Sequence, residues 1–509
     1  MGTTFEGSEV LVELRRGVGR SLRAQLEEGL REAARSGRLA AGSRLPPTRA
    51  LAADLGVSRR LVVDAYAQLL AEGYLTSRRG AGTFVAEAAG RVTPSAAEPP
   101  HRPLKYDFFP GYPDLASFPR RPWLRALREA LATAPPQSLG YPDARGAPEL
   151  RRALAEHLGR VRGAVADPHR IVICSGAAQA LVLLARALGG PHVAVEDPGL
   201  PPHRAILAAH GARLSPLPVD ADGARVGELG AIAARAGRVD AVLVTPAHQS
   251  PTGVAMAPAR RAQLLEWAGG GGLVIEDDYD AEYRYDRAPL AALQGLAPER
   301  VIYMGTASKT MAPALRLGWL LLPPQLVEPM AQQRNLADHG APTLEQLALA
   351  RMIESGAYDR HLRQARRRHR LRRDAFVAAV ERHLPGARVT GLAAGLHAIL
   401  RLRDEIDGAA LARGAARESV GVYPLGFGFM VPRARGRELV LGYANLSEQA
   451  IDEGIRRLAG VLADVQGPPA AHTARGRRRA RERPAREAAR GGSRAAGARR
   501  REVRSPGSG

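Results

Sequence analysis

Lysine is almost absent from this chain. Of 73 lysine and arginine residues only two are lysines, Lys105 and Lys309. Arginine stays protonated and cannot form a Schiff base, whereas the pKa of a lysine amine can fall far enough for the amine to attack a carbonyl. Lys309 follows the apolar run 301–304, and Lys105 has no comparable surroundings. An isolated lysine is commonly a surface residue, but its retention in so lysine-poor a chain makes Lys309 an equally good candidate for chemistry.

Cysteine and long apolar runs are lacking as well. The single cysteine, Cys174, excludes an internal disulfide and favours a reducing compartment. It lies in an apolar run, where a free cysteine is usually a small buried side chain. No run of about 18 apolar residues is present to cross a membrane, and the polar N-terminus does not resemble a signal peptide. We therefore expect a soluble, cytoplasmic protein.

Acidic residues are few relative to basic ones, and the net charge of +22 is unevenly distributed. Residues 467–509 contain thirteen arginines and three glutamates but almost no large apolar side chain. Such a segment cannot bury enough apolar surface to fold, so residues 466–509 are predicted to form a disordered, Arg-rich tail. The tail could bind nucleic acid without sequence preference or be a solvated extension, and the sequence leaves both open.

Residues 10–86 have the pattern of a small DNA-binding unit. Apolar residues at helical spacing precede a short helix that starts at Thr48, a turn at residues 56–58, and a second helix with Ser58 as N-cap. Two short strands around a basic tip complete the pattern of a winged helix-turn-helix. The start of the second helix would enter a major groove, and the tip would follow the phosphates.

The string LPPTRALAADLGVSRRLVVDAYAQLLAEGYLTSRRGAGTFV in this segment resembles the DNA-binding domain of GntR-family bacterial regulators. The resemblance implies double-stranded operator DNA as a partner. Winged helices also dock proteins, which is the alternative. Residues 87–105, without periodicity, are predicted to be a linker. The positions that the resemblance implies for DNA contact are Arg49, Ser58, Arg59, Arg60 and Gly82.

Residues 106–465 alternate strand-like and helix-like runs, which predicts an α/β fold with a largely parallel sheet. Ligands of such folds bind at the carboxyl ends of the strands. Small residues that open a helix follow the first apolar run, and backbone N–H groups at such a helix start can bind phosphate. Asp277 follows the fourth apolar run and Lys309 follows the fifth. The five runs are 170–173, 192–195, 240–244, 272–275 and 300–303.

An amine, a carboxylate, a phenol and a phosphate cradle at strand ends are the groups that pyridoxal 5'-phosphate (PLP) requires. Their order resembles class I and II aminotransferases of fold type I, which have a largely parallel, seven-stranded-type sheet and a smaller α+β subdomain. The resemblance implies that Lys309 is the catalytic Schiff-base lysine, Asp277 the partner of the pyridine nitrogen and Tyr279 the phenol near the ring hydroxyl. It also implies that a tyrosine, Tyr141, reaches the phosphate of the neighbouring subunit of a dimer. The implied phosphate ligands are Thr306, Ser308, Arg316 and the backbone amides of Ala177 and Ala178.

Three positions depart from the aminotransferase pattern. Leu200 stands where the family places an aromatic residue over the ring. Ser250 stands where an asparagine would bind the ring hydroxyl, a loss for which His248 or Gln249 could compensate. Val440 stands where an arginine would clamp the substrate α-carboxylate. The nearby Arg433, Arg435 and Arg437 are either substitutes for that arginine or only surface charge. We therefore expect PLP binding to be retained and ordinary transamination to be weak or absent.

The two halves in this order resemble the MocR group of GntR-family transcription regulators. That resemblance implies a head-to-tail homodimer whose aminotransferase-like domain senses PLP, or an amine or amino-acid effector, through a Schiff base on Lys309. One alternative is an active PLP-dependent aminotransferase that carries a regulatory DNA-binding domain. Another is a nucleic-acid-associated protein that binds through its Arg-rich tail. No metal site is expected.

Overall fold

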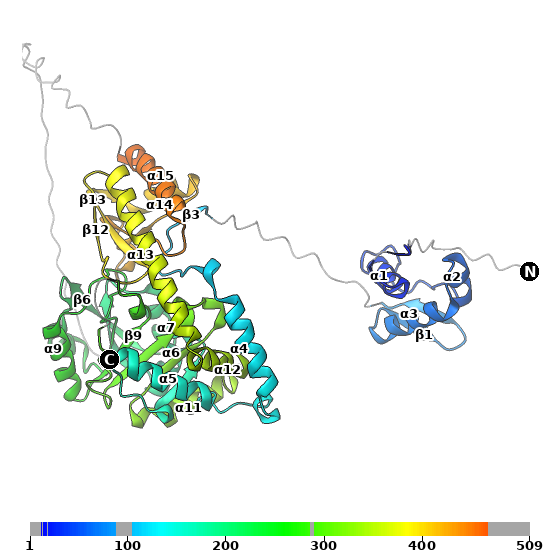
Figure 1. The fold of residues 1–509 in the computed structure, drawn as a ribbon, viewed down its shortest axis with the longest axis horizontal. Helices are drawn as coiled ribbons and strands as arrows, with labels where there is room; N and C mark the ends of the chain where they lie inside the picture. Colours follow the sequence, from blue (N-terminus) through cyan, green and yellow to red (C-terminus); the bar gives the residue numbers. More distant parts are fainter. Residues whose placement is uncertain (1–11, 13, 18, 88–103, 286–289, 467–509) are drawn as a thin grey trace, which may run out of the picture. The chain divides into compact units, whose positions relative to one another are not determined.

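The computed structural model describes residues 12, 14–17, 19–87, 104–285 and 290–466, which fall into two compact units (Figure 1). The first unit is Met1–Arg102 and the second is Pro103–Gly509. Nearly all of the predicted linker and tail lies outside the described residues. Among the described helices, none has the length and apolar character that a membrane crossing requires.

The first unit is the winged helix-turn-helix that the sequence predicts. Its apolar core includes Leu26, Val62 and Leu69, which approach from α1 and α3. The hydroxyl of Ser58 accepts a hydrogen bond from the amide of Leu61 at 3.3 Å and so caps α3 as expected. The elements are α1 (Leu22–Arg35), α2 (Thr48–Asp54), α3 (Arg59–Ala71) and an antiparallel wing of β1 (Leu75–Arg78) and β2 (Gly82–Val85).

The second unit is built on an eight-stranded sheet of order β4-β11-β10-β9-β8-β5-β6-β7. The pairs from β10 through β9, β8 and β5 to β6 are parallel, whereas β11 runs antiparallel to both of its neighbours. The predicted, largely parallel α/β fold is therefore confirmed. The strands are β4 (Ile171–Cys174), β5 (His192–Asp197), β6 (Arg213–Asp220), β7 (Gly223–Ala224), β8 (Ala241–Val244), β9 (Leu273–Asp278), β10 (Val301–Thr306) and β11 (Gly318–Leu321).

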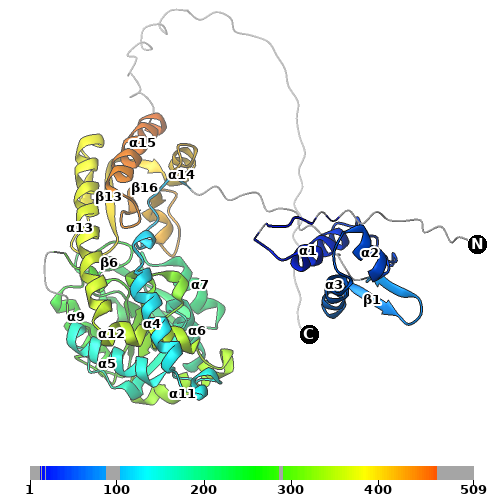
Figure 2. The same ribbon diagram turned by 45° about the vertical axis from the view of Figure 1, so that its right-hand side comes forward.

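Helices cover the sheet and bury its almost wholly apolar strands. On one side α4, α5 and α12 pack against one another, as Figure 2 shows. Cys174 is fully buried in the core beside α6, as its apolar surroundings predict. The helices around the large sheet are α4 (Arg120–Thr133), α5 (Pro148–Arg162), α6 (Ala177–Ala187), α7 (Pro201–Ala209), α8 (Leu229–Ala236), α9 (Pro258–Gly269), α10 (Ala307–Thr310), α11 (Pro324–Asp338) and α12 (Thr343–Glu354).

A smaller α+β subdomain follows along the chain. Its four-stranded sheet has the order β12-β13-β16-β15, and a short parallel pair, β3 with β14, ties the start of the unit to it. The long helix α13 packs Leu362 into the core of the large sheet and Phe376 into that of the subdomain, so it joins the two (Figure 1). The elements are β3 (Tyr106–Asp107), α13 (Ala357–His383), β12 (Arg388–Thr390), β13 (His397–Asp407), α14 (Gly408–Arg417), β14 (Val420–Gly421), β15 (Tyr423–Pro424), β16 (Arg435–Gly442) and α15 (Glu448–Gln466).

Candidate functional site

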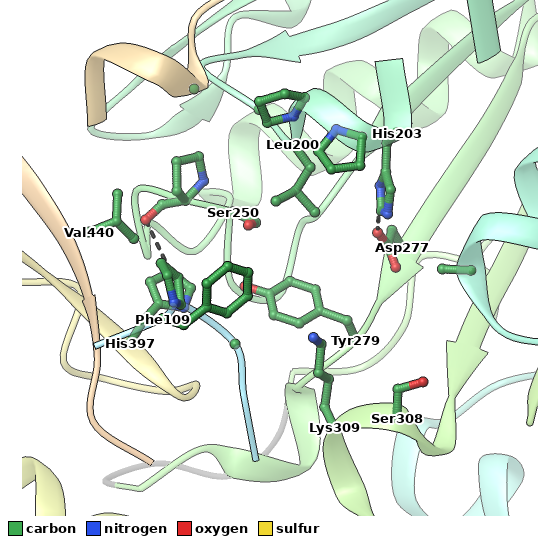
Figure 3. A pocket seen from close by; sticks show the side chains of 18 of the residues that line it. Phe109, Leu200, His203, Ser250, Asp277, Tyr279, Ser308, Lys309, His397 and Val440 are labelled. Atoms are coloured by element: carbon green, nitrogen blue, oxygen red, sulfur yellow. Dashed lines mark hydrogen bonds and ion pairs between the residues drawn. The ribbon is translucent and has the colours of Figure 1, made fainter. Parts of the chain in front are cut away.

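The predicted cofactor residues meet in one cavity of about 530 Å³ in the second unit. The cavity lies at the carboxyl ends of the parallel strands, where α/β folds bind their ligands. Figure 3 shows Lys309 at its centre, with Asp277 and Ser308 to one side and His397 and Val440 to the other. The sequence-predicted residues that line it are Ala177, Ala178, Ser250, Asp277, Tyr279, Thr306, Ser308, Lys309 and Arg316.

A cradle for a phosphate opens at the start of α6. Gly176 adopts φ +89°, and a Cβ placed on it would lie 3.9 Å from both Arg316 Nη1 and Ser308 Oγ and 4.0 Å from Thr306 Oγ1. This glycine therefore leaves a space ringed by one guanidinium and two hydroxyls, in front of the first amides of α6. A helix start with such neighbours favours a dianion, so the residues present fit the phosphate of PLP.

Asp277 is held at the end of β9 by its neighbour in sequence. Because side chains alternate along a strand, Asp277 faces the cavity while Asp278 faces the core, where it accepts bonds of 2.7 Å from both Arg162 Nε and the Tyr303 hydroxyl. Burial raises the pKa of Asp277 to about 8, and the negative charges of Asp278 and Asp280 add to the rise. A protonated pyridine nitrogen would supply the positive charge that lets this carboxyl ionise.

Lys309 is largely withdrawn from water. Burial lowers the pKa of its amine, and the carboxylates of Asp280 and Asp277 offset this only in part. A Cβ placed on Gly111, at φ +77°, would lie 3.3 Å from the Lys309 amine, so a glycine is needed where the chain crosses above it. Tyr283 also donates a bond of 3.2 Å to the Lys309 carbonyl. The site therefore presents a positioned amine with an increased neutral fraction, the form that attacks a carbonyl.

Tyr279 is fixed by hydrogen bonds beside Ser250. Its hydroxyl donates to the His248 carbonyl at 3.1 Å and lies 3.1 Å from His248 Nδ1. Burial alone would lower the pKa of His248, but an ion pair of 2.9 Å with Asp280 outweighs it and raises the pKa. His248 thus supports the phenol from behind, whereas the amide of Gln249 binds the Glu196 carboxylate and backbone carbonyls instead of the cavity.

The positions that depart from the aminotransferase pattern also line the cavity. Leu200 and Val440 both line it, together with Phe109 and His397. Arg316, in the phosphate cradle, is the single arginine among the described residues of the lining. The arginines shortly before the position of the missing clamp are exposed and lie outside the lining; they are Arg433, Arg435 and Arg437.

Tyr141 lies apart from the cavity of its own chain. Its side chain is 91% exposed and contacts the ring of His339 at a centroid distance of 5.8 Å. Leu139 beside it is 63% exposed and Leu336 is 70% exposed. Tyr141 therefore does not serve the cavity of its own chain, and its role at the phosphate of a second subunit stays a prediction.

The predicted DNA-contacting residues are all exposed on the first unit. Arg59 and Arg60 start α3, directly after the capping Ser58, and Arg49 lies in the first turn of α2. Gly82 starts β2 at φ +113°, and a Cβ there would approach Arg44 Nε to 3.0 Å, so the wing requires a glycine at this position. The structure thus gathers cations at the helix end that a major groove would receive.

Two histidines of the cavity were not identified from the sequence. His203, on α7, has Nδ1 3.6 Å from a carboxylate oxygen of Asp277, and burial together with Lys309 lowers its pKa to about 4. His397 starts β13 in the other subdomain. The motif GLPPH places His203 in the first turn of the helix after β5, which was a usable signal, but nothing near His397 in the sequence points to the cavity.

Comparison with known proteins agrees with both units. Residues 112–458 match the model of the family "Aminotransferase class I and II", and residues 22–85 match "Bacterial regulatory proteins, gntR family". The second unit also resembles the kynurenine aminotransferase of Pyrococcus horikoshii in complex with PMP, with a TM-score of 0.65 and 28% identity over 70% of this chain and 90% of that one. An archaeal alanine:glyoxylate aminotransferase gives a TM-score of 0.65 and 30% identity over the same shares.

Fold and site define a PLP-binding aminotransferase-like domain joined to a winged helix that binds DNA. Proteins that are similar to this chain over most of their own length are transcription regulators. The chain is 36% identical to the probable rhizopine catabolism regulatory protein MocR of Rhizobium meliloti, over 87% of this chain and 94% of that protein. It is 36% identical to the pyridoxine biosynthesis regulator PdxR of Corynebacterium glutamicum, over 75% and 83%. The chain belongs to the GntR family of bacterial regulators, to its MocR-type members, and is a PLP-dependent transcriptional regulator.

Proposed function

We propose that the regulator senses a small amine at Lys309 and transmits its presence to the DNA-binding unit. The observation that carries this proposal is the contrast inside one cavity: the amine, the carboxylate, the phenol and the phosphate cradle for PLP all line it, whereas a valine stands where an aminotransferase clamps the carboxylate of its substrate. A site that holds the cofactor but binds its substrate weakly is suited to reversible detection.

When bound, PLP supplies an aldehyde carbon that can form a Schiff base with Lys309 or with another amine. Lys309 would hold that carbon through its Nζ, and an effector amine would compete for the same carbon, passing its two protons to the lysine nitrogen that it replaces. Burial lowers the pKa of Lys309, which favours the neutral amine that such a reversible exchange requires. The effector can alter DNA affinity only by binding one arrangement of the protein more tightly than another.

The proposed assembly is a head-to-tail homodimer in which Tyr141 of each subunit completes the phosphate site of the other. The exposure of Tyr141 and of the leucines around it supports this arrangement. Tyr141→Phe should weaken PLP retention while leaving the dimer intact by sedimentation, because only one hydroxyl is removed. Unchanged PLP retention would contradict the shared site.

A titration tests the sensing role directly. Purified protein with PLP is titrated with a panel of amines and amino acids while visible absorbance and keto-acid product are followed, and DNA protection upstream of its own and neighbouring genes is measured in parallel. We expect one amine to shift the absorbance and alter the protection without steady product formation. Absorbance that responds to an amine while DNA protection stays constant would refute sensing.

DNA binding through α3 has its own test. Arg59→Ala should weaken specific binding by about 1–3 kcal/mol, because a helix-end arginine in a major groove reads bases. Arg38→Ala, an exposed arginine beyond the end of α1, is the matched control. The two variants should keep the same PLP absorbance. If loss of residues after 466 abolishes specific binding and Arg59→Ala does not, the Arg-rich tail is the reader instead.

The second candidate function is a working aminotransferase, and the complete cofactor site favours it. It predicts continuous conversion of an amino acid and a keto acid, abolished by Lys309→Ala. Single-turnover absorbance changes without multiple turnovers would exclude it as the main role.

A further inference from the structure

Two aromatic side chains of the cavity are left partly exposed by the chain around them. Phe109 is 40% exposed and Phe427 is 44% exposed, and both line the cavity that contains Lys309. Figure 3 shows the Phe109 ring between Val440 on one side and Lys309 on the other. Exposing large apolar side chains to water is unfavourable, and such side chains in a cavity are typical of a ligand site. The two rings therefore indicate a ligand group with an apolar surface.

Phe109 is held in a fixed position close to the Lys309 amine. A Cβ placed on Gly442 would overlap the Phe109 carbonyl, so the end of β16 fits closely against this backbone. The Phe109 ring meets the ring of Tyr423 edge-on, at 5.0 Å between centroids. Gly111, two residues further on, is the glycine that crosses above the Lys309 amine, where a Cβ would lie 3.3 Å from Nζ. A group joined to an amine at Lys309 would therefore lie within reach of the Phe109 ring.

The segment that carries Phe427 is held in place as well. It is the short helix η7 (Leu425–Gly428), whose last carbonyl accepts a bond of 2.8 Å from the Arg204 guanidinium. Leu425, at its start, is buried in a small apolar cluster with Val440. Phe427 is thus an exposed aromatic ring on a fixed backbone, beside the apolar side chain that replaces the carboxylate clamp.

The other polar side chains of the described lining are already occupied. Apart from the groups assigned to PLP and His203 behind them, they are His397 and Tyr423. The Tyr423 hydroxyl donates to the Asp107 carboxylate at 2.6 Å. His397 Nε2 lies 3.1 Å from the Pro251 carbonyl; its Nδ1 has no hydrogen-bond partner in the described chain, but it is buried and a ligand in the cavity does not reach it. Beyond its amine, a ligand therefore meets mainly apolar side chains in this lining.

The same lining gives a carboxylate no partner among the residues that the structure describes. Arg316 belongs to the phosphate cradle and Lys309 to the reacting amine. Burial lowers the pKa of His397 to about 4, so this ring is neutral near pH 7. Val440 offers only methyl groups where a clamp would stand. A carboxylate would lose its hydration here without gaining an ion pair, which is unfavourable.

We propose that the effector is an arylalkylamine without a carboxylate, and that Phe109 and Phe427 bind its aromatic ring. This inference rests on the proposed function, because it assumes that the nitrogen of the effector reacts at the carbon held by Lys309. It adds the chemical class of the effector and the two side chains that select it. Aromatic rings pair edge-to-face or offset, which a saturated ring of the same size does not reproduce.

The test uses the full-length protein with bound PLP and compares 2-phenylethylamine with three ligands. Butylamine lacks the ring, 2-cyclohexylethylamine has a saturated ring, and L-phenylalanine adds a carboxylate to the same skeleton. Dissociation constants come from the visible absorbance and, independently, from calorimetry. Each is divided by the constant of the same amine with free PLP, which removes differences in intrinsic reactivity.

The expected order of affinity follows from the lining. We expect 2-phenylethylamine to bind about tenfold more tightly than butylamine, from the apolar area that its ring buries. It should bind about threefold more tightly than 2-cyclohexylethylamine, from contact between aromatic rings. L-phenylalanine should bind more weakly than 2-phenylethylamine, because its carboxylate lacks a partner.

Variants attribute the preference to the two rings. Phe109→Leu and Phe427→Leu keep an apolar side chain without the ring, so each should reduce the preference for 2-phenylethylamine over 2-cyclohexylethylamine. The absorbance of bound PLP shows whether each variant retains its cofactor. Leu371→Ala, at a leucine of α13 that is 60% exposed and outside the lining, is the control and should leave the preference unchanged. If Phe109→Leu does not fold, Phe427→Leu and the ligand comparison on the unaltered protein still decide.

The outcomes separate this inference from the proposed function. If butylamine or 2-cyclohexylethylamine binds as tightly as 2-phenylethylamine, the inference is wrong, yet amine sensing survives. The inference is also wrong if L-phenylalanine binds as tightly or more tightly, because a cation from outside the described lining then receives the carboxylate. The same holds if both leucine variants keep the full preference. If no amine alters the absorbance, the proposed function itself fails.

Discussion

The cavity has a cofactor end, around Gly176, Asp277 and Lys309, and an effector end, around Phe109, His397 and Val440, and the two ends differ in the charge that they present. The cofactor end places a guanidinium, two hydroxyls and a helix start around one space and a carboxylate beside another. The effector end presents apolar side chains and one neutral imidazole. The cofactor end is formed by the large sheet and the start of α6, whereas His397 on β13 and Val440 on β16 reach the cavity from the smaller subdomain. An aminotransferase-like domain can thus keep its cofactor while the recognition of an amino-acid carboxylate is lost.

The largest effect is expected when the Lys309 amine is removed and its positive charge is kept, which tests the assignment of the cofactor end. Lys309→Arg should lose the visible absorbance of the Lys309–PLP linkage completely, because a guanidinium forms no Schiff base. Lys105→Arg at the other lysine, which is exposed and stacks on Tyr106, is the matched control and should keep it. Absorbance that persists in Lys309→Arg would mean that the cofactor end has been assigned to the wrong residue.

The next largest effect is expected at Asp277. Asp277→Asn should weaken PLP binding by about 1.5–3 kcal/mol, the usual value of a hydrogen bond to a charged group, as measured by equilibrium dialysis. The asparagine has the same shape and cannot stabilise a protonated pyridine nitrogen. An unchanged dissociation constant would mean that the Asp277 carboxylate does not contribute to PLP binding.

Asp277 also predicts how the stability of the PLP-free protein depends on pH. Its pKa is raised to about 8 in the folded chain and is about 3.9 when unfolded, so the folded state holds the proton more tightly. The stability that this carboxyl contributes is complete below the unfolded value and is lost as pH rises towards 8, at about 1.4 kcal/mol per unit of pKa difference. Between pH 5 and pH 8, the midpoint temperature of thermal unfolding should therefore fall less for Asp277→Asn than for the unaltered protein. Parallel curves for the two proteins would contradict this.

The sequence predicts the site residues that lie next to a recognisable strand and misses those that come from elsewhere in the chain. Asp277, Thr306 and Lys309 directly follow apolar strands, so the parallel topology alone brings them together. The strands β6 and β11 were not predicted, because a proline-interrupted run and the short run GWLL lack a distinct pattern. His397 approaches from the separate subdomain, and its unpaired nitrogen depends on a contact with Pro251, 146 residues away. Such an atom is visible only in three dimensions.

A gain of function would sharpen the comparison from the effector end. Val440→Arg should bring amino-acid binding to about tenfold higher affinity, since a guanidinium can pair with a carboxylate through two hydrogen bonds. The same change should weaken amines without a carboxylate, because the new charge then lacks a partner. Absorbance titration with 4-aminobutyrate and butylamine measures both effects, and PLP absorbance confirms that the variant folds. Val431→Arg, at a valine that is 79% exposed, controls for added charge.

The smallest effect is expected at His203, behind the cofactor end. His203 Nδ1 lies 3.6 Å from a carboxylate oxygen of Asp277, which is longer than a hydrogen bond. We therefore expect His203 to act by packing beside the carboxyl and positioning it. His203→Phe should weaken PLP binding by about 0.5–1 kcal/mol and raise the pH sensitivity of the absorbance, because the ring nitrogen loses support for its proton. His203→Gln should restore both. If phenylalanine and glutamine behave alike, His203 only fills space, and the cofactor end depends on Asp277 without help from α7.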